Sequence, residues 1–143
     1  MEKLIVGECE YIHLPQLNLY NIDAKIDTGA DSCAIHCDEI RLLENNTVQF
    51  RLLDPKHPSY TQAPIILPVY KIKRVKSSNG TMQERIFVHV AITLMGRTIT
   101  TPLSLANRNV MKYPMLIGRS FLRHHFIVDV SRQYLSPLQG NSQ

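Results

Sequence analysis

The sequence lacks several features that mark whole classes of protein. Its cysteines number three, so an even-numbered disulfide framework is excluded and a reducing compartment is expected. No apolar run approaches the roughly 18 residues of a membrane-spanning helix. The N-terminal apolar stretch is too short and wrongly flanked for a signal peptide. We therefore expect a cytoplasmic protein with no membrane attachment.

Two motifs of nucleotide and metal chemistry are also missing. The phosphate-binding Gly-x-x-x-x-Gly-Lys-[Ser/Thr] loop is absent, so any dependence on ATP would require a partner protein. The zinc-protease signature His-Glu-x-x-His is absent as well. Cys33, His36 and Cys37 could still supply two or three zinc ligands, with His13 or Cys9 completing the set. Because alternate residues of a strand face opposite sides, we favour a buried Cys33 beside a surface His36, with no metal and no other cofactor.

Acidic residues are scarce in the second part of the chain. Residues 1–54 carry ten of the twelve acids and four of the sixteen bases, whereas residues 55–143 carry two acids and twelve bases. The net charges of the two parts are therefore −6 and +10. Two interpretations stay open: charged faces that complement each other, or a cleft whose positive field attracts acidic peptides. We do not expect nucleic-acid binding, because the basic positions lack interleaved aromatic residues for stacking.

Asp27-Thr28-Gly29 lies at the end of a predicted strand. Residues 22–26 alternate apolar and polar side chains with period two, which is typical of a half-buried strand. We expect Gly29 to adopt a positive φ and to permit the close approach that a tight turn requires. The Thr28 hydroxyl can tie this turn to a neighbouring one. A carboxylate held in this way is suited to activating water.

A second motif follows far along the chain. Met115-Leu116-Ile117 is an apolar run stopped by Gly118 and followed by Arg119, which predicts a buried strand that passes through a glycine into a short helix. Asp-Thr-Gly alone is a weak signal, because short strings recur by chance. The pairing of the two motifs is much more specific.

Together the two motifs resemble the two parts of a retropepsin active site. The chain is similar to one family in particular, the retropepsin-like peptidases labelled "ATP-dependent zinc protease" and associated with ATP-grasp glutamate ligases of the RimK type. The similarity spans roughly residues 4–130 and is carried by Gly7-Glu8, Leu14-Pro15, residues 74–80, Ser104-Leu105, Arg108 and residues 114–122. The family usually continues Ala-Arg-Thr-Ser after the Asp-Thr-Gly turn. Here the sequence is Ala30-Asp31-Ser32-Cys33, and Asp31 is similar to the viral retropepsins.

The resemblance implies an all-β fold, a small closed barrel with one short C-terminal helix, as a single domain over residues 1–143. Its catalytic residues would be Asp27, Thr28 and Gly29. Only one Asp-Thr-Gly is present, and an aspartic peptidase needs two carboxylates about 3 Å apart that share a proton. The expected enzyme is therefore a homodimeric aspartic endopeptidase with Asp27 from each subunit. Acidic or glutamate-tailed peptides are its expected substrates, and a glutamate ligase is its expected functional partner.

Residues 71–85 predict a β-hairpin, because Asn79-Gly80 is a strong turn signal. In a retropepsin such a hairpin closes over the substrate as a flap, and here it would form a basic lid. The resemblance assigns substrate contacts to Ala30 and Asp31 at the turn and to Arg74, Lys76, Asn79 and Gly80 in the hairpin. The alternative is an exposed hairpin whose lysines prevent aggregation.

Gly118 and Arg119 are expected to support the active-site turn. In the viral relatives the positions of Asp31 and Arg119 form an ion pair beside the active site that helps to hold the dimer. A planar guanidinium suits such a partly buried carboxylate. We expect Arg119 to be structural and not catalytic.

The remaining pattern is one of strands and turns. Strands are expected at residues 6–14, 19–26, 48–53, 69–75, 86–94 and 97–102. Helices are expected at residues 120–125 and 38–44, and an irregular loop at residues 54–68, where four prolines occur. Two other functions stay open beside the aspartic peptidase: a non-catalytic peptide-binding dimer and a metal-dependent peptidase.

Overall fold

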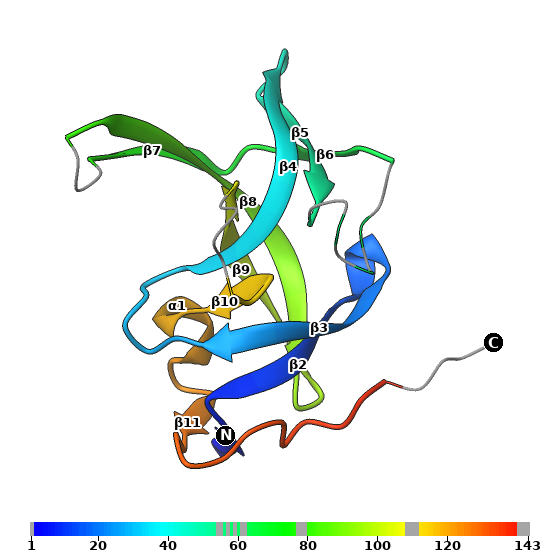
Figure 1. Ribbon diagram of the computed structural model, residues 1–143, viewed down its shortest axis with the longest axis vertical. Helices are drawn as coiled ribbons and strands as arrows, with labels where there is room; N and C mark the ends of the chain where they lie inside the picture. The colour runs from blue at the N-terminus through cyan, green and yellow to red at the C-terminus, as the bar shows by residue number, and fades with distance from the viewer. Residues whose placement is uncertain are drawn as a thin grey trace.

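The computed structural model describes residues 2–53, 56, 58, 60, 63–76, 80–107 and 112–139. Within these residues the chain forms eleven strands, one α-helix and one short 3-10 helix (Figure 1). The strands are β1 (Leu4–Val6), β2 (Cys9–Leu14), β3 (Leu19–Ile26), β4 (Cys33–Leu43), β5 (Thr47–Leu52), β6 (Ile65–Pro68), β7 (Lys71–Lys76), β8 (Met82–Leu94), β9 (Arg97–Ala106), β10 (Met115–Ile117) and β11 (Phe126–Val128). The helices are η1 (Pro15–Leu17) and α1 (Arg119–Leu122).

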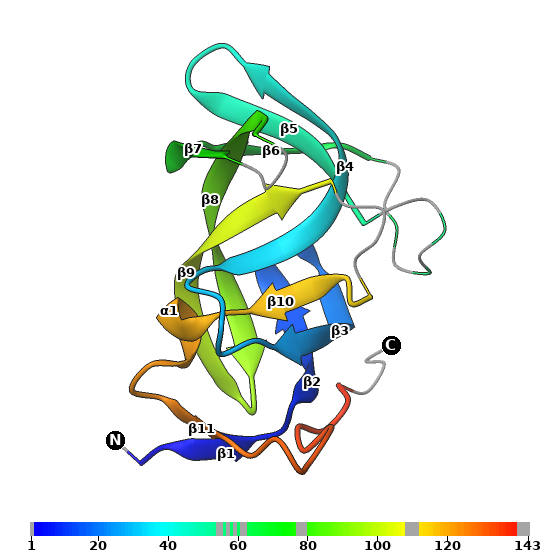
Figure 2. The ribbon, with the colours of Figure 1, turned by 60° about the vertical axis from the view of Figure 1, so that its left-hand side comes forward.

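Within the described ranges, six strands close a barrel in the order β10-β3-β2-β8-β9-β4, and β4 pairs with β10 to complete the ring. Strands β5 and β6 continue outward from β4, while β7 pairs with β8 and extends away from the barrel as a hairpin (Figures 1 and 2). Strands β1 and β11 form a separate parallel pair. The expected small closed all-β barrel with a short C-terminal helix is confirmed.

The core follows from the alternation of side chains along these strands. The barrel strands direct apolar residues inward, and β5 and α1 add further buried side chains. The largest fully buried side chains are Phe50, Phe121, Ile12, Leu14, Ile22, Ile35, Leu52, Leu53, Ile92, Leu94, Leu103 and Met115. Most of the buried apolar residues form one continuous cluster. In the described part of the chain, no helix has the length and apolar character needed to cross a membrane.

The strand at residues 19–26 has the expected bounds, but the helix expected at residues 38–44 is wrong. Asp38 to Leu43 form the outer half of β4 and pair with β5 in antiparallel register. The spacing of apolar residues in so short a run fits a helix or a strand equally. The backbone hydrogen bonds supplied by β5 decide between them, with an irregularity at Glu39, whose φ is 51°.

Part of the loop expected at residues 54–68 is also a strand. Ile65–Pro68 forms β6, which pairs with β5 at the end of the sheet order. An edge position tolerates proline because one side of the strand needs no hydrogen-bond donor. The C-terminal helix is shorter than expected: it ends at Leu122, because Arg123 is extended and His124 has a φ of 73°.

Candidate active site

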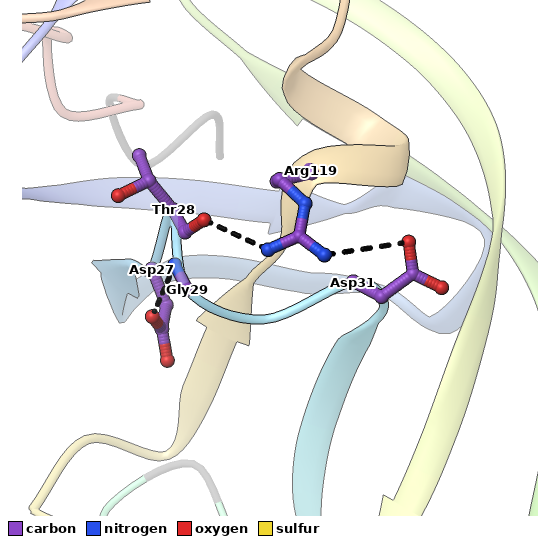
Figure 3. Close-up of polar contacts among 5 residues, drawn as sticks. All are labelled: Asp27, Thr28, Gly29, Asp31 and Arg119. Carbon is purple, nitrogen blue, oxygen red and sulfur yellow. Dashed lines mark hydrogen bonds and ion pairs between the residues drawn. The ribbon is translucent and has the colours of Figure 1, made fainter.

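Asp27 occupies a turn that is fixed by its own backbone (Figure 3). The carbonyl oxygen of Asp27 accepts a hydrogen bond from the amide of Ala30 at 3.2 Å. One carboxylate oxygen, Oδ1, accepts a bond from the amide of Gly29 at 3.0 Å. Asp27 is half-buried, whereas Thr28 and Gly29 are exposed. The carboxylate is therefore oriented by the chain and still reachable from outside.

The second motif lies directly beside this turn. Strand β10 pairs with β3 in parallel register, so Ile117 is opposite Ile26. The amide of Asp27 continues that ladder by donating to the carbonyl oxygen of Ile117 at 2.8 Å. On the far side of the turn, the amide of Arg119 donates to the carbonyl oxygen of Ala30 at 2.8 Å. The two motifs are thus joined by main-chain bonds at both ends of the turn.

Gly29 differs in detail from its expected role. Positive φ among the described glycines occurs at Gly80 and Gly96, and Gly29 is not one of them. A Cβ at Gly29 would lie 3.3 Å from Oδ1 of Asp27, which is a tight contact with the carboxylate. The glycine therefore leaves room for the bond between its own amide and Asp27, and it does not supply a left-handed turn.

Gly118 is required by close packing. A Cβ at this position would lie 2.5 Å from the carbonyl oxygen of Ser32 and 2.9 Å from that of Ala30. Both oxygens belong to the main chain after Asp27, so they cannot move without moving the turn. The glycine lets the second motif approach the first closely enough to hydrogen-bond to it.

Arg119 lies between two partners on the turn, as Figure 3 shows. One guanidinium nitrogen donates to the carbonyl oxygen of Thr28 at 3.0 Å, and the other lies 4.0 Å from Oδ1 of Asp31. The carboxylate of Asp27 points away from this arginine. The side chains of Arg119 and Asp31 are 43% and 73% exposed. Within the single chain this long, exposed ion pair contributes little, and the bond to Thr28 is the stronger contact.

A hollow of about 310 Å³ opens beside Asp27. We refer to it as the active-site hollow. Its described lining comes from the Asp27 turn, from β4, β9 and β10, and from the β7–β8 hairpin, namely Asp27, Ala30, Asp31, Ser32, Cys33, Ala34, Lys73, Arg85, Phe87, Ser104, Ala106 and Leu116. In Figure 1 the turn after β3 and the β7–β8 hairpin lie on the same side of the barrel. A peptide segment placed here would meet carboxylates at the turn and two cations on the hairpin.

The basic residues of the hairpin divide between its two faces. Lys73 and Arg85 are cross-strand partners and both line the active-site hollow. Arg74 alternates with Lys73 along β7 and lies 3.7 Å from its own cross-strand partner, Glu84. Lys76 has the same parity as Arg74, so strand geometry places these two on the opposite face from Lys73.

The substrate contacts expected from the sequence are therefore distributed unevenly. Ala30 and Asp31 line the active-site hollow. Gly80 lies at the hairpin tip with a φ of 86°, Asn79 lies outside the described residues, and Arg74 and Lys76 are not among the lining residues. The sequence counts Lys73 and Arg85 among the basic residues of the expected lid, but it does not assign them individual substrate contacts. Period-two alternation separates Lys73 from Arg74, but it does not say which of them faces the hollow.

The possible zinc ligands are not gathered into a site. Within the described ranges, no group of three or more His, Cys, Asp or Glu side chains is arranged to hold a metal ion. Cys33 and Cys37 are fully buried on β4, and His36 is buried as well, in contrast to its expected surface position. The main chain of His36 is hydrogen-bonded to neighbouring segments: its amide donates to the carbonyl oxygen of Pro114 and its carbonyl oxygen accepts from the amide of Leu53, both at 2.8 Å.

Burial controls the chemistry of the two β4 thiols. Loss of solvation raises the pKa of Cys33 to about 11, although bonds from Gly118 and Thr101 act in the opposite direction. Burial likewise raises the pKa of Cys37 to about 12. A thiol is nucleophilic only as the thiolate. Cys33 therefore lines the active-site hollow as an un-ionised side chain at neutral pH, and its thiol is not a nucleophile there.

Comparison with known proteins gives consistent matches. A sequence model of the family described as "RimB-like: Retropepsin-like aspartic endopeptidase RimB" matches residues 5–139. Two curated relatives are each 33% identical to this chain. The one from Shewanella halifaxensis matches over 139 residues and 92% of this chain, and the one from Shewanella pealeana over 146 residues and 97% of it. Both are named "Probable alpha-L-glutamate ligase". The chain spans only 30% and 31% of their lengths.

A solved structure has the same fold. The crystal structure of a Legionella pneumophila protein of unknown function superposes with a TM-score of 0.73 and 24% sequence identity. The match covers 95% of this chain and 100% of that chain. The barrel and its extensions thus occur together in an experimentally determined protein.

Proposed function

The chain belongs to the RimB-like family of retropepsin-like aspartic endopeptidases, and on this premise we propose that it is an aspartic-type peptidase that works as a homodimer, with Asp27 contributed by each subunit. One observation carries the proposal. The Asp27 carboxylate is half-buried on a backbone-bonded turn and lines a hollow large enough for a segment of peptide.

The chemistry requires two such carboxylates. When two carboxyl groups are about 3 Å apart they share one proton, because both cannot ionise at that separation. The ionised partner accepts a proton from water while the water oxygen attacks the peptide carbonyl carbon. The protonated partner then donates its proton towards the leaving amine as the C–N bond breaks. One chain supplies one Asp-Thr-Gly turn, so the second carboxylate comes from a second copy.

Exposure around the turn supports a subunit contact at this place. Thr28 and Gly29 are exposed in the single chain, and so is the side chain of Asp31. A second copy placed against this surface would bring its own Asp27 turn close to the first. It would also cover the ion pair between Asp31 and Arg119, which would strengthen that pair by excluding water.

Acidic peptides are the substrate class that we propose. Lys73 and Arg85 line the active-site hollow with Asp27, and both face it from the hairpin that would cover a bound peptide. The relatives named as glutamate ligases contain a region similar to this chain within a longer protein. A peptidase acting on glutamate tails would reverse the bond formation that such a name describes. We therefore propose a functional link to a ligase of that kind.

A cytoplasmic location belongs to the same proposal. Cys9, Cys33 and Cys37 are free and buried, and unpaired thiols are typical of reducing compartments.

The decisive experiment compares wild type with Asp27→Asn. Sedimentation over a broad concentration range gives the mass of each, and a panel of glutamate-tailed and neutral peptides gives their activity. Asp38→Asn is the matched control, because this carboxylate lies on β4 and is not among the residues that line the hollow. We expect both variants to remain dimers and only Asp27→Asn to lose cleavage.

The other two functions give different results in the same assay. An enzyme that loses activity to a chelator while Asp27→Asn stays active is a metal-dependent peptidase. If wild type and Asp27→Asn are both dimers that bind acidic peptides equally well, and neither cleaves any of them, the protein is a binding protein. Cleavage by a species that is monomeric at every concentration would refute the shared pair of aspartates.

A further inference from the structure

Glu10 is a fully buried carboxylate that the active-site chemistry does not use. It lies on β2, and its two oxygens have separate partners. Oε2 accepts a hydrogen bond from the amide of Gly7 at 2.7 Å, and Oε1 accepts one from the amide of Ser136 at 2.8 Å. The first partner is three residues away in sequence and the second is 126 residues away. One side chain therefore joins the two ends of the described chain.

The segment that Glu10 holds is residues 131–139, which we call the C-terminal strap. It follows β11 and runs beside β2, where it is drawn in red in Figures 1 and 2. Main-chain groups of β2 and the preceding turn bond it along its length: Glu8 donates to the carbonyl oxygen of Arg132 at 2.8 Å, and Cys9 accepts from the amide of Tyr134 at 2.9 Å. The strap thus follows the edge of the strand.

Side chains reinforce this attachment. The Tyr134 ring stacks on Tyr11 with a centroid distance of 4.6 Å, and its hydroxyl donates to Asp23 at 2.9 Å. The Ser136 hydroxyl donates to the carbonyl oxygen of Tyr11 at 2.9 Å. These contacts add to the bond between the Ser136 amide and Glu10, so both main chain and side chains hold the strap.

Gly7 is also shaped to this contact. A Cβ at Gly7 would lie 2.4 Å from the carbonyl oxygen of Arg132, so a larger residue would push the strap away. The turn at Gly7 and Glu8 is therefore bonded to the Glu10 carboxylate through the Gly7 amide and to the strap through the Glu8 amide.

The same turn leads to the catalytic strand. The amide of Glu8 donates a hydrogen bond to the strap at Arg132, and the carbonyl oxygen of Glu8 accepts one from the amide of Ile26 at 2.9 Å. Ile26 is the last residue of β3 and directly precedes Asp27. A continuous path of hydrogen bonds therefore runs from the strap through Glu8 to the residue before Asp27.

We propose that Glu10 is a positioning residue: it latches the C-terminal strap onto the Gly7–Glu8 turn, and the latched turn fixes the end of β3 that carries Asp27. The catalytic part of this inference rests on the proposed function of Asp27. The structural part, that the latch restricts the backbone motion of Ile26 and Asp27, does not rest on it. That part can be tested whether or not the protein cleaves peptides.

The test uses Glu10→Gln in the full chain. Glutamine keeps the size of the side chain, but it replaces one of the two carboxylate oxygens with an NH2 group. That group only donates hydrogen bonds, so the bond from either Gly7 or Ser136 is lost. Amide hydrogen exchange is measured at Ile26 and Asp27 and, as internal references, at Val90 and Thr101 in the β8–β9 pair. Val48→Ala is the matched control. Val48 is a buried residue of β5, so its substitution removes core packing, and β5 is distant in the sheet order from β2, to which the strap is bonded.

We expect exchange at Ile26 and Asp27 to rise in Glu10→Gln by about tenfold relative to the references, since local opening is set by the contacts of that segment. Val48→Ala should change the exchange rates of all four amides by the same factor, or leave all four unchanged. An unchanged ratio in Glu10→Gln would overturn the inference. If Glu10→Gln does not fold, Tyr134→Ala is used instead, because it loosens the strap from its more exposed side. A raised exchange ratio at Ile26 and Asp27 then supports the inference, and an unchanged ratio overturns it.

Activity separates the two proposals. If the peptidase is active, Glu10→Gln should lower kcat by roughly ten- to a hundredfold with little change in KM, because a small misplacement of a catalytic group has that effect. Equal loss in Glu10→Gln and Val48→Ala would mean a structural role only and would overturn the positioning role. If wild type cleaves nothing, the proposed function fails, while the exchange measurement still decides the latch.

Discussion

The amide of Asp27 donates a hydrogen bond to the carbonyl oxygen of Ile117 at 2.8 Å. These residues belong to the two motifs that stand out in the sequence, and the fold makes them neighbours by pairing β3 with β10. The second motif therefore acts as the support of the first. Its glycine sets how close the support comes, and its arginine binds the outside of the turn.

Gly118→Ala should displace the Asp27 turn. The added methyl group would meet main-chain oxygens of Ser32 and Ala30, so we expect a loss of roughly 1–3 kcal/mol in the free energy of unfolding, as for overpacked sites. Gly96→Ala is the control, because its Cβ would meet nothing within 4 Å while its φ is 78°, and strain there costs roughly 1–2 kcal/mol. Urea unfolding gives the stabilities.

Peptide cleavage separates these two glycines further. Gly118→Ala should lose activity even in conditions where it is fully folded, whereas folded Gly96→Ala should keep it. Equal activity in the two variants would mean that the contact between the motifs does not position Asp27.

Arg119→Ala should cost only about 1 kcal/mol in the unfolding of the single chain. The guanidinium loses one good hydrogen bond to Thr28 and a 4.0 Å approach to Asp31, and both side chains of the ion pair are substantially exposed. Asp31→Asn should cost less than Arg119→Ala for the same reason. Unfolding is measured at a concentration where sedimentation shows a monomer. A loss of about 3–5 kcal/mol for Arg119→Ala would indicate a buried pair instead.

Neutralising Lys73 and Arg85 should weaken the binding of acidic peptides more than neutralising Arg74 and Lys76. The first pair lines the active-site hollow, whereas Arg74 lies near Glu84. With glutamine at each pair of positions, we expect Kd for a glutamate-tailed peptide to rise by about tenfold or more for the first pair.

Fluorescence anisotropy in the Asp27→Asn background measures this binding without cleavage. Raised salt should reduce the difference between the two double variants, because it screens exposed charges. A neutral peptide of equal length should bind the two equally. Equal losses of acidic-peptide binding would show that the hairpin acts through its net charge and not through the face that borders the hollow.

Stability should fall at alkaline pH because of the two β4 thiols. Their ordinary pKa of 9.0 is raised to about 11 for Cys33 and about 12 for Cys37 in the fold. The stabilising contribution is complete below pH 9 and is lost as the pH rises towards the folded values, since only the unfolded thiols ionise in that window. Each thiol should contribute a slope of about 1.4 kcal/mol per pH unit there.

The comparison that checks this is wild type against the double variant Cys33→Ala/Cys37→Ala, unfolded by urea at several pH values from about 8 to about 11, a range that brackets the unfolded thiol pKa. Tyrosines and lysines titrate in the same range in both proteins, so the difference between the two curves isolates the thiols. Parallel curves would contradict the raised pKa values.

The sequence by itself identified the two motifs that the fold brings together at the Asp27 turn. Asp27-Thr28-Gly29, Gly118 and Arg119 are recognisable because a carboxylate turn and a close-packed glycine require those residue types in that order. The alternation at residues 19–26 also predicted a strand with the bounds that the structure has. The strand depends on local geometry, which neighbouring residues determine, whereas Gly118 and Arg119 are recognisable as motif residues even though the partners that explain them are distant in sequence.

Only the tertiary structure decided which residues meet. The segment at residues 38–44 is a strand over most of its length because β5 pairs with it. Lys73 lines the hollow with Asp27, and Arg74 does not, because the hairpin presents one face to the hollow. Glu10 joins the strap because the barrel brings Ser136 to β2. Periodicity tells which side chains share a face, but the partner that covers the face comes from distant parts of the chain, so the packing of those parts sets the outcome.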